Sequence, residues 1–299
     1  MYSAQDERAP LCNVLVSYAY MGSTMLDMIG RWRDSMRLVI DCGAFTAHRR
    51  GETISLDAYC EFIGQMPVRP WRYFALDVVG DPVRTLANYD RMIERGLRPI
   101  AIFTRGESLE VLEHYYRTAD VIGTGGMTDM PGWHGFINGL TKAAAGRRLH
   151  WLGFTNLRFM KFYRPYMADS SNWRTGDRFG HMRLYMGHGQ VRLIKRTDFV
   201  GLRDDAVMAR IRHYGFEPAD LLKRDGWYGK GGDNVNNRIC AASAVAFSLD
   251  VQKHLGTLMF NAVSTPNHLR QLMEAWERQH VTRGQLREDR DRLLCGDDR

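Results

Sequence analysis

The chain has 299 residues, of which 44% are hydrophobic and 25% are charged, as is typical of a folded globular protein. No apolar run approaches the roughly 18–20 residues that a membrane helix needs, and the polar stretch from Met1 to Pro10 lacks the apolar core of a signal peptide. We therefore expect a soluble protein of the cytoplasm, or of the host's cytoplasm if a phage encodes it.

The cysteines are scattered along the chain and form no pair at CxxC spacing, the usual sign of a zinc site. Their arrangement favours reduced thiols over a disulfide framework. The five residues are Cys12, Cys42, Cys60, Cys240 and Cys295. The sequence accordingly predicts no bound metal and no cofactor.

The formal net charge is +7, and the excess is concentrated between Arg147 and Arg203, where twelve Lys and Arg residues accompany three Asp and Glu residues. Aromatic residues, among them Trp151, Tyr163 and Trp173, are interleaved with these basic residues. Basic side chains can pair with phosphates and flat rings can stack on bases, so this segment is typical of a polynucleotide-binding surface. A solvated surface over an ordinary aromatic core would give the same pattern.

Short apolar runs predict seven strands before residue 170, and their continuous apolar character indicates burial on both faces. The expected strands are Asn13–Tyr20, Leu38–Gly43, Tyr73–Val79, Pro99–Thr104, Val121–Gly126, Leu149–Thr155 and Tyr166–Ser170.

Helical patterns lie between these runs. Ser55 is expected to cap one helix, Asp81 and Pro82 to open a second that ends at Gly96, and Ser108 to begin a third. A further helix is expected from about Trp133 to Ala145. This alternation predicts an α/β fold with a parallel sheet, and the number of units favours a (β/α)8 TIM-like barrel. A doubly wound sheet is less consistent, because no GxGxxG follows the first strand.

The pattern changes after Asp169. Glycines punctuate short β-like runs that predict a β-hairpin near 176–196, inserted in a barrel core that spans 1–202. We expect 203–299 to form a helical C-terminal region that packs on or completes the barrel, with its strongest helix at Asn236–Leu255.

Three expected strands end in an aspartate: Asp41 in VIDCGAF, Asp77 in FALDVVG and Asp169 in YMADSSNW. The active site of a parallel barrel lies at the carboxyl ends of its strands. A carboxylate that follows a buried strand must be hydrated, paired or used in chemistry. Capping of the following helix would explain a single one of these residues. Three of them together favour a catalytic site.

The order of the motifs VIDCGAFTA, FALDVVGDP, GTGGM, HWLGFT and ADSSNW resembles the tRNA-guanine transglycosylase superfamily. It more closely resembles the DNA transglycosylase branch, the DpdA type of phages and bacterial genomic islands. The resemblance extends from about Val14 to Trp173. It implies an enzyme without a cofactor that replaces guanine in DNA with a free 7-deazaguanine base of the preQ0 or preQ1 type.

The resemblance also implies roles for individual residues. Asp169 matches the nucleophile that forms a covalent glycosyl intermediate, and Asp41 matches the general acid/base. Asp77 matches the residue that reads the purine N1–H and exocyclic amine. The other residues implied to bind the base are Phe45, Arg105, Gly125, Gly126, Leu152 and Gly153.

The basic segment around Asp169 supplies the expected polynucleotide contacts. These residues are Trp173, Arg174, Arg178, Lys195 and Arg196, which we expect to line the approach to the barrel mouth. The expected partners are DNA and the free base, with no membrane, and the sequence leaves a homodimer open.

Two features depart from the family. The tRNA enzymes carry a zinc site of closely spaced cysteines and a histidine near the C-terminus, and no such spacing is present here. Cys42 replaces the more common serine of the first motif. Three alternatives remain: a transglycosylase that acts on RNA, a catalytically silent nucleic-acid-binding barrel, and a barrel hydrolase of small glycosides.

Overall fold

The computed structural model describes residues 11–125, 132–228 and 232–279. The chain forms two compact units. The first comprises Met1–Ser171 with Val251–Pro266, and the second comprises Asn172–Asp250 with Asn267–Arg299. The sequence predicted a division after residue 202, whereas the chain leaves the first unit after Ser171 and returns to it at Val251.

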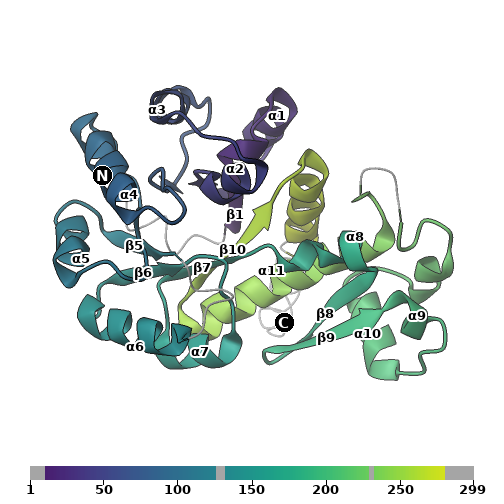
Figure 1. The fold of residues 1–299 in the computed structure, drawn as a ribbon. Helices are drawn as coiled ribbons and strands as arrows, with labels where there is room; N and C mark the ends of the chain where they lie inside the picture. Colours follow the sequence, from purple (N-terminus) through teal and green to yellow (C-terminus); the bar gives the residue numbers. More distant parts are fainter. Residues whose placement is uncertain (1–10, 126–131, 229–231, 280–299) are drawn as a thin grey trace, which may run out of the picture. The chain divides into compact units, whose positions relative to one another are not determined.

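The first unit contains an eight-stranded parallel sheet that curls as part of a barrel and is surrounded by helices (Figure 1). Its strand order is β3-β2-β1-β10-β7-β6-β5-β4. The strands are β1 Cys12–Ser17, β2 Met36–Asp41, β3 Arg72–Tyr73, β4 Ala101–Phe103, β5 Val121–Thr124, β6 Arg148–Trp151, β7 Met167–Ser170 and β10 Leu258–Val263. The predicted α/β class and parallel sheet are confirmed, and each of the seven expected strand runs overlaps one of these strands, although the overlap with β3 is Tyr73 alone.

The eighth strand, β10, falls within the segment that the sequence predicted to be helical. It pairs with β1 on one side, where Val14 lies opposite Asn261, and with β7 on the other, where Asp169 lies opposite Phe260. β10 therefore makes β1 and β7 members of one sheet, although they are more than a hundred residues apart in the sequence.

Backbone hydrogen bonds also link the end of β3 and the residues after it to the residue that precedes β4. Phe74, which follows β3, forms an isolated parallel bridge with Ile100, which precedes β4. The Ile100 amide donates to the Tyr73 carbonyl at 2.8 Å, and the Ala75 amide donates to the Ile100 carbonyl at 2.9 Å. The interior of the curled sheet is filled by large apolar side chains, among them Val39, Phe74 and Phe260, each 0% exposed.

The helices of the first unit begin where the sequence placed their caps. Ser55 accepts a hydrogen bond from the Ala58 amide, and Asp81 accepts one from the Arg84 amide at 2.9 Å. The helices are α1 Ser23–Arg31, α2 Ala44–Arg50, α3 Leu56–Gln65, α4 Pro82–Glu94, α5 Leu109–Tyr116, α6 Trp133–Ala144 and α7 Leu157–Tyr163, with a 3-10 turn η2 at Tyr18–Tyr20.

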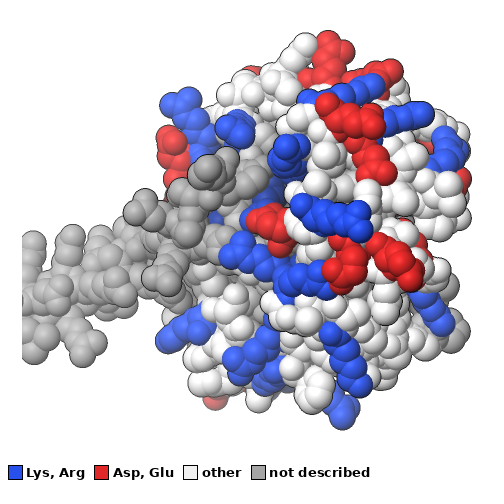
Figure 2. All heavy atoms as spheres, turned by 90° about the vertical axis from the view of Figure 1, so that its left-hand side faces the viewer, with Lys and Arg blue, Asp and Glu red and all other residues white. Residues whose placement is uncertain are grey.

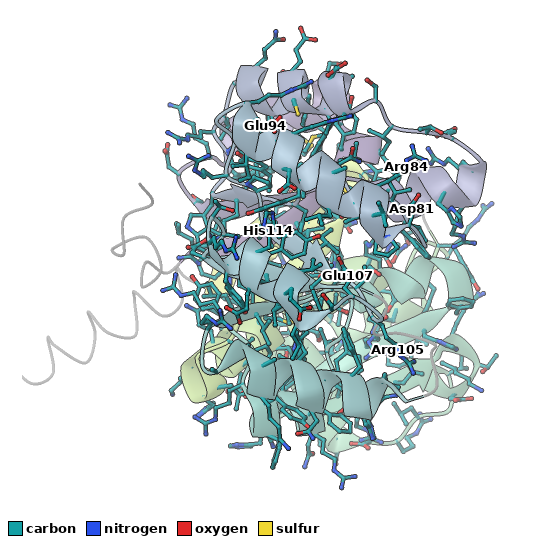
Figure 3. The ribbon with its side chains drawn as sticks, turned by 60° about the vertical axis from the view of Figure 1, so that its left-hand side comes forward. Asp81, Arg84, Glu94, Arg105, Glu107 and His114 are labelled. Atoms are coloured by element: carbon teal, nitrogen blue, oxygen red, sulfur yellow. The ribbon has the colours of Figure 1, made fainter. Side chains whose placement is uncertain are left out.

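All of the helices that follow a strand start at the same edge of the sheet. In Figure 3, Asp81, Arg84, Arg105 and Glu107 lie on one side of the unit, whereas Glu94 and His114, near helix C-termini, lie on the other. The carboxyl ends of the strands and the amino ends of these helices therefore share one edge, which is where active sites of parallel α/β folds are found.

The second unit contains the expected hairpin, formed by β8 His181–Gly187 and β9 Gln190–Lys195 in antiparallel pairing. The Tyr185 amide donates to the Ser243 hydroxyl of the long helix α11, Val235–Leu255, at 3.0 Å. This helix confirms the one expected at Asn236–Leu255. The other elements are η3 Asn172–Thr175, α8 Gly176–Phe179, α9 Arg196–Phe199, α10 Asp205–His213 and η4 Pro218–Leu222.

Gly176 shows how closely the backbone of the second unit is packed. A Cβ atom at this position would lie 2.6 Å from the Asn236 side-chain nitrogen and 2.8 Å from the His181 carbonyl oxygen. Both distances are far below a normal contact, so only glycine fits here.

Basic and acidic side chains are interspersed on the face of the molecule that Figure 2 shows. On α4 and α5, Asp90 pairs with His114, and Glu113 pairs with Arg147, which precedes β6. No helix within the described ranges is both long and apolar enough to cross a membrane.

We predict that Phe260→Ala lowers the free energy of unfolding by about 3–5 kcal/mol, because it opens a cavity in the sheet interior. Phe260 is 0% exposed and its ring stacks on Trp71 with centroids 5.9 Å apart. Urea unfolding provides the measurement, with Phe162→Ala as control. The Phe162 side chain is 78% exposed, so its loss should change stability by less than about 0.5 kcal/mol. Equal, small effects of the two substitutions would show that β10 does not pack in the core.

Candidate active site

Asp41 ends β2 and lies opposite Ser17 at the end of β1. Its Oδ2 accepts a hydrogen bond from the Gly43 amide at 3.1 Å. Gly43 has a φ of +84°, and a Cβ atom there would lie 3.0 Å from the Ser17 hydroxyl. The turn that presents Asp41 therefore requires glycine at position 43.

The environment of Asp41 favours its protonated form. Burial is the main cause of a pKa raised to about 7, and the nearby carboxylates of Asp77 and Asp169 raise it further. The Ser17 hydroxyl and the Gly43 amide act in the opposite direction but do not cancel these effects. A carboxyl group with a pKa near neutrality is suited to general acid/base chemistry.

Asp77 lies just after the extended segment that follows β3. The Cys42 thiol donates a hydrogen bond to its Oδ1 at 2.9 Å. Burial raises the pKa of Asp77, and the hydrogen bond from Cys42 opposes this shift. Burial and the two neighbouring carboxylates hold the pKa of Cys42 well above its usual value, so this residue serves as a neutral donor.

Asp169 lies in β7 and is 8% exposed. Two donors converge on one of its oxygens, Oδ1: the His150 ring nitrogen Nε2 at 2.9 Å and the Gly153 amide at 2.9 Å. No described residue donates a hydrogen bond to Oδ2. The carboxylate is thus anchored through one oxygen, which leaves the other available for a ligand.

His150, on β6, is the residue of this site that sequence reasoning missed. Its side chain is 0% exposed, and its ring lies against the edge of Phe74 with centroids 5.0 Å apart. The ring nitrogen Nδ1 is buried and accepts no hydrogen bond from the described residues. The arrangement fits a ring that carries its proton on Nε2, because Nε2 is the nitrogen that has an acceptor.

The three strand-end carboxylates come together in the first unit. The charges of both Asp77 and Asp169 act on Asp41, which places each of the two within electrostatic range of Asp41. Their positions at the carboxyl ends of parallel strands explain this convergence. Three carboxylates in three different environments can divide nucleophilic, acid/base and substrate-binding roles.

The residues expected to bind the base are distributed around this edge. Phe45, in the first turn of α2, is 67% exposed and presents its ring to solvent. Leu152 packs against the buried apolar side chains of the sheet interior, and the Gly153 amide donates a hydrogen bond to Asp169. The Gly125 amide donates to the Phe103 carbonyl at 3.0 Å. Gly126 lies outside the described residues.

Arg105 is exposed and its guanidinium lies beside Gly132, where a Cβ atom would be 3.2 Å from Nη2. This position lies at the amino end of α6, and the role of Arg105 in base binding stays a prediction.

The residues expected to bind nucleic acid belong to the second unit, whereas the carboxylates belong to the first. Lys195 and Arg196 are exposed at the end of the hairpin, and the Arg196 guanidinium lies 4.7 Å from the Tyr228 ring centroid. Arg174 is partly buried, and the Arg178 side chain lies outside the described residues.

Trp173 requires a correction. It was expected among the polynucleotide contacts, but it is 5% exposed and its ring packs against His268 at a centroid distance of 5.5 Å. Its ring serves the core of the second unit and offers no free face for stacking. The sequence pattern could not separate the two roles, because a buried and a stacking tryptophan look alike in it.

Within the described ranges, no group of three or more His, Cys, Asp and Glu side chains could hold a metal ion. The described cysteines, Cys12, Cys42, Cys60 and Cys240, are all buried free thiols. No protein-family model matches this sequence, and a comparison with curated proteins found no match.

Asp41 should make the stability of the protein depend on pH. Its pKa is about 7 in the folded chain and 3.8 for an ordinary aspartate, so the folded state holds the proton more tightly. This contribution is complete below about pH 4, declines as the pH rises and is lost once the pH has passed about 7. We therefore predict that Asp41→Asn removes this decline.

The measurement is urea unfolding of both proteins between pH 4 and pH 8. Asp34→Asn provides the control, because that side chain is 90% exposed and its loss should leave the pH dependence unchanged. A wild-type protein and an Asp41→Asn variant with parallel pH profiles would contradict the environment described for Asp41.

Proposed function

We propose that the protein is a glycosyltransferase that replaces guanine in DNA with a 7-deazaguanine base through a covalent aspartyl-glycosyl intermediate. The observation that carries this proposal is the contrast between Asp169 and Asp41. The Asp169 carboxylate is anchored through a single oxygen, and the Asp41 carboxyl group has a pKa raised to about 7. A nucleophile and a general acid/base are the two groups that a base exchange requires.

In the first half of the proposed reaction, Asp169 Oδ2 attacks C1′ of the target nucleotide while the bond from C1′ to guanine N9 breaks. The departing guanine takes a proton from Asp41. The hydrogen bonds from His150 and Gly153 hold Oδ1, so that Oδ2 keeps one orientation during the attack. The target nucleotide must leave the duplex stack to reach this position, at a cost of a few kcal/mol.

In the second half, the deazaguanine enters and gives its N9 proton to Asp41. Its N9 then attacks C1′, and the bond between C1′ and Asp169 breaks. Atoms and charges balance. The first half transfers C1′ from guanine to Asp169 and a proton from Asp41 to guanine, and the second half reverses both transfers with the deazaguanine. No external acid or cofactor is needed.

Asp77 is the proposed reader of the purine. Its Oδ1 already accepts a hydrogen bond from Cys42, which orients the carboxylate and leaves Oδ2 for the purine N–H groups. The neutral thiol at position 42 supports this role, since it donates a hydrogen bond without adding a charge.

The proposed architecture is a closed (β/α)8 barrel. The bridge between Phe74 and Ile100 supports closure, because it links the two strands that are otherwise the edges of the sheet. The proposed polynucleotide surface includes the exposed Lys195 and Arg196 of the second unit. DNA is proposed over RNA from the resemblance of the motifs to the DNA-modifying branch.

Asp169→Asn should abolish exchange, lowering it by at least a thousandfold, while DNA still binds, because the shape of the side chain is kept and its nucleophilicity is lost. The measurement is incorporation of labelled guanine into DNA and, in parallel, into tRNA. Asp34→Asn, on the surface, provides the matched control. Exchange near the wild-type rate in Asp169→Asn would assign the nucleophile elsewhere, and incorporation into tRNA alone would make RNA the substrate.

The double variant Lys195→Gln/Arg196→Gln should bind DNA more weakly and with a smaller salt dependence. Each lost phosphate contact lowers the slope of log K against log salt by about 0.9, so the slope should fall by about 2. Arg33→Gln/Arg69→Gln changes the net charge equally and is the control. If both double variants show the wild-type slope, Lys195 and Arg196 belong to an ordinary solvated surface.

A further inference from the structure

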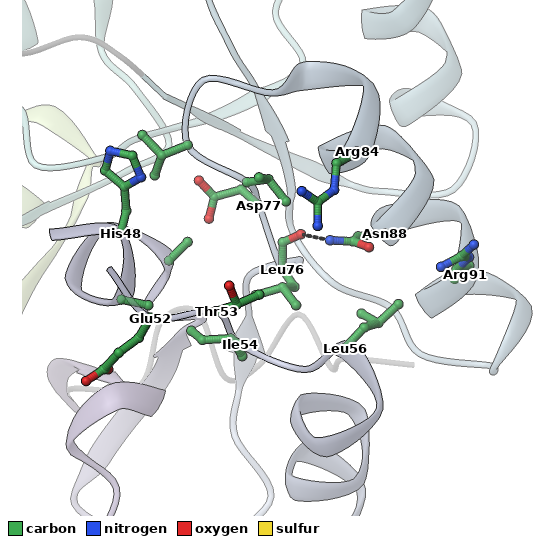
Figure 4. A pocket seen from close by; sticks show the side chains of 14 residues that line it. His48, Glu52, Thr53, Ile54, Leu56, Leu76, Asp77, Arg84, Asn88 and Arg91 are labelled. Carbon is green, nitrogen blue, oxygen red and sulfur yellow. Dashed lines mark hydrogen bonds between the residues drawn. The ribbon is translucent and has the colours of Figure 1, made fainter. Parts of the chain in front are cut away.

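A pocket of about 330 Å³ lies beside Asp77, between α2, the loop that precedes α3, and α4 (Figure 4). This volume is at the small end of the roughly 300–1,000 Å³ that ligand sites occupy. Asp77 contributes to its lining, but Asp41 and Asp169 do not. The pocket therefore adjoins the centre at which glycosyl transfer is proposed, and the two share Asp77.

One side of the pocket is basic. Arg84, Asn88 and Arg91 are spaced at i, i+4 and i+7 on α4, so they share a face of that helix. Figure 4 shows them along one side of the pocket, with His48 from α2 on the other. Three groups that carry or can accept positive charge thus surround one small volume.

These arginines differ from others nearby. Arg95, directly after α4, pairs with Asp57, and Arg147 pairs with Glu113. Among the described residues, neither Arg84 nor Arg91 has a side-chain hydrogen bond or an ion pair. Two unpaired guanidinium groups on one wall favour an anion with several oxygens, since guanidinium groups bind phosphate in a bidentate manner.

The remainder of the lining selects more than a bare ion. Ile54, Leu56 and Leu76 supply apolar surface that a flat ring can cover. The Asn88 side-chain nitrogen donates to the Leu76 carbonyl at 3.0 Å, so the amide is fixed with its oxygen free to accept. Asp77 offers a second acceptor. Ring N–H groups of a ligand would satisfy both acceptors.

Acidic groups limit where an anion can lie. Glu52 also lines the pocket, but it is partly compensated by Arg50 at 4.0 Å. In Figure 4, the Asp77 carboxylate and the Arg84 guanidinium point in different directions. An anionic group fits at the α4 side, whereas the donor-bearing end of a ligand fits toward Asp77.

From this arrangement we propose a second ligand site, which binds a nucleoside monophosphate with its phosphate between Arg84 and Arg91 and its base against the apolar wall and Asp77. The small, bounded volume suits a single nucleotide and not a continuous strand. The proposal shares the purine-reading role of Asp77 with the proposed function, but binding requires neither DNA nor turnover, so it can be tested separately from base exchange.

Isothermal titration calorimetry of the full chain without DNA tests this site. The probes are guanosine 5′-monophosphate, guanosine and inorganic phosphate. The monophosphate should bind at least tenfold more tightly than either of the others, because it alone satisfies both ends of the pocket. Equal binding of guanosine, equal binding of phosphate, or no binding of the monophosphate at millimolar concentration would each overturn the proposal.

Two variants place the binding within the pocket. Arg84→Gln/Arg91→Gln should weaken monophosphate binding at least tenfold, and Val79→Trp should weaken it by filling the pocket without changing the charge. Arg33→Gln/Arg69→Gln, with the same change in net charge, should bind as the wild type does. Folding of every variant is checked by circular dichroism. Unchanged affinity in either folded pocket variant would overturn the assignment.

Discussion

The organisation of the first unit depends on the placement of three carboxylates, one buried and two half-buried, at one edge of a parallel sheet. Burying a charge is unfavourable unless hydrogen bonds or opposite charges compensate it. Each aspartate is compensated in a different way. Asp169 receives two hydrogen bonds from His150 and Gly153, Asp77 receives one from the Cys42 thiol, and Asp41 retains a proton up to about pH 7. No lysine or arginine contributes a direct contact to these carboxylates among the residues that the structure describes.

This arrangement requires the strand order that β10 creates. β10 lies between β1 and β7, so the strand that positions Ser17 and the strand that holds Asp169 are separated by one neighbour. Between β7 and β10 the chain builds most of the second unit, and α11 leads it back to the sheet. The sheet therefore gains its last strand only after about eighty residues of a different unit have been added, which makes the contacts of β10 long-range.

Much of this was predictable from local signals. The seven strand runs, the Ser55 and Asp81 caps and the three strand-end aspartates all follow from side-chain patterns over a few residues. β10 was missed because its six residues LMFNAV include Asn261 and follow a long helix directly, so the strand signal is short. Its burial is set by β1 and β7, which lie far away in the sequence.

His150 and Trp173 were misjudged for a related reason. In the run RLHW a histidine reads as an ordinary strand residue, and only the neighbouring strand β7 places Asp169 against it. Trp173 reads as an aromatic within a basic segment, and only the packing of His268 shows that it is buried. In both residues the role is decided by a partner that the local sequence does not contain.

Cys42 and Asp41 are adjacent in sequence, and both interact with Asp77. Cys42 points its thiol at Asp77, while Asp41 lies next to the charge of Asp77. A serine at position 42 could donate the same hydrogen bond, so the orientation of Asp77 does not depend on sulfur. Burial and then the charge of Asp77 raise the pKa of Asp41 toward neutrality, where protonated and ionised forms coexist. A reversible exchange needs that coexistence, because one residue must give a proton to the departing base and accept one from the entering base.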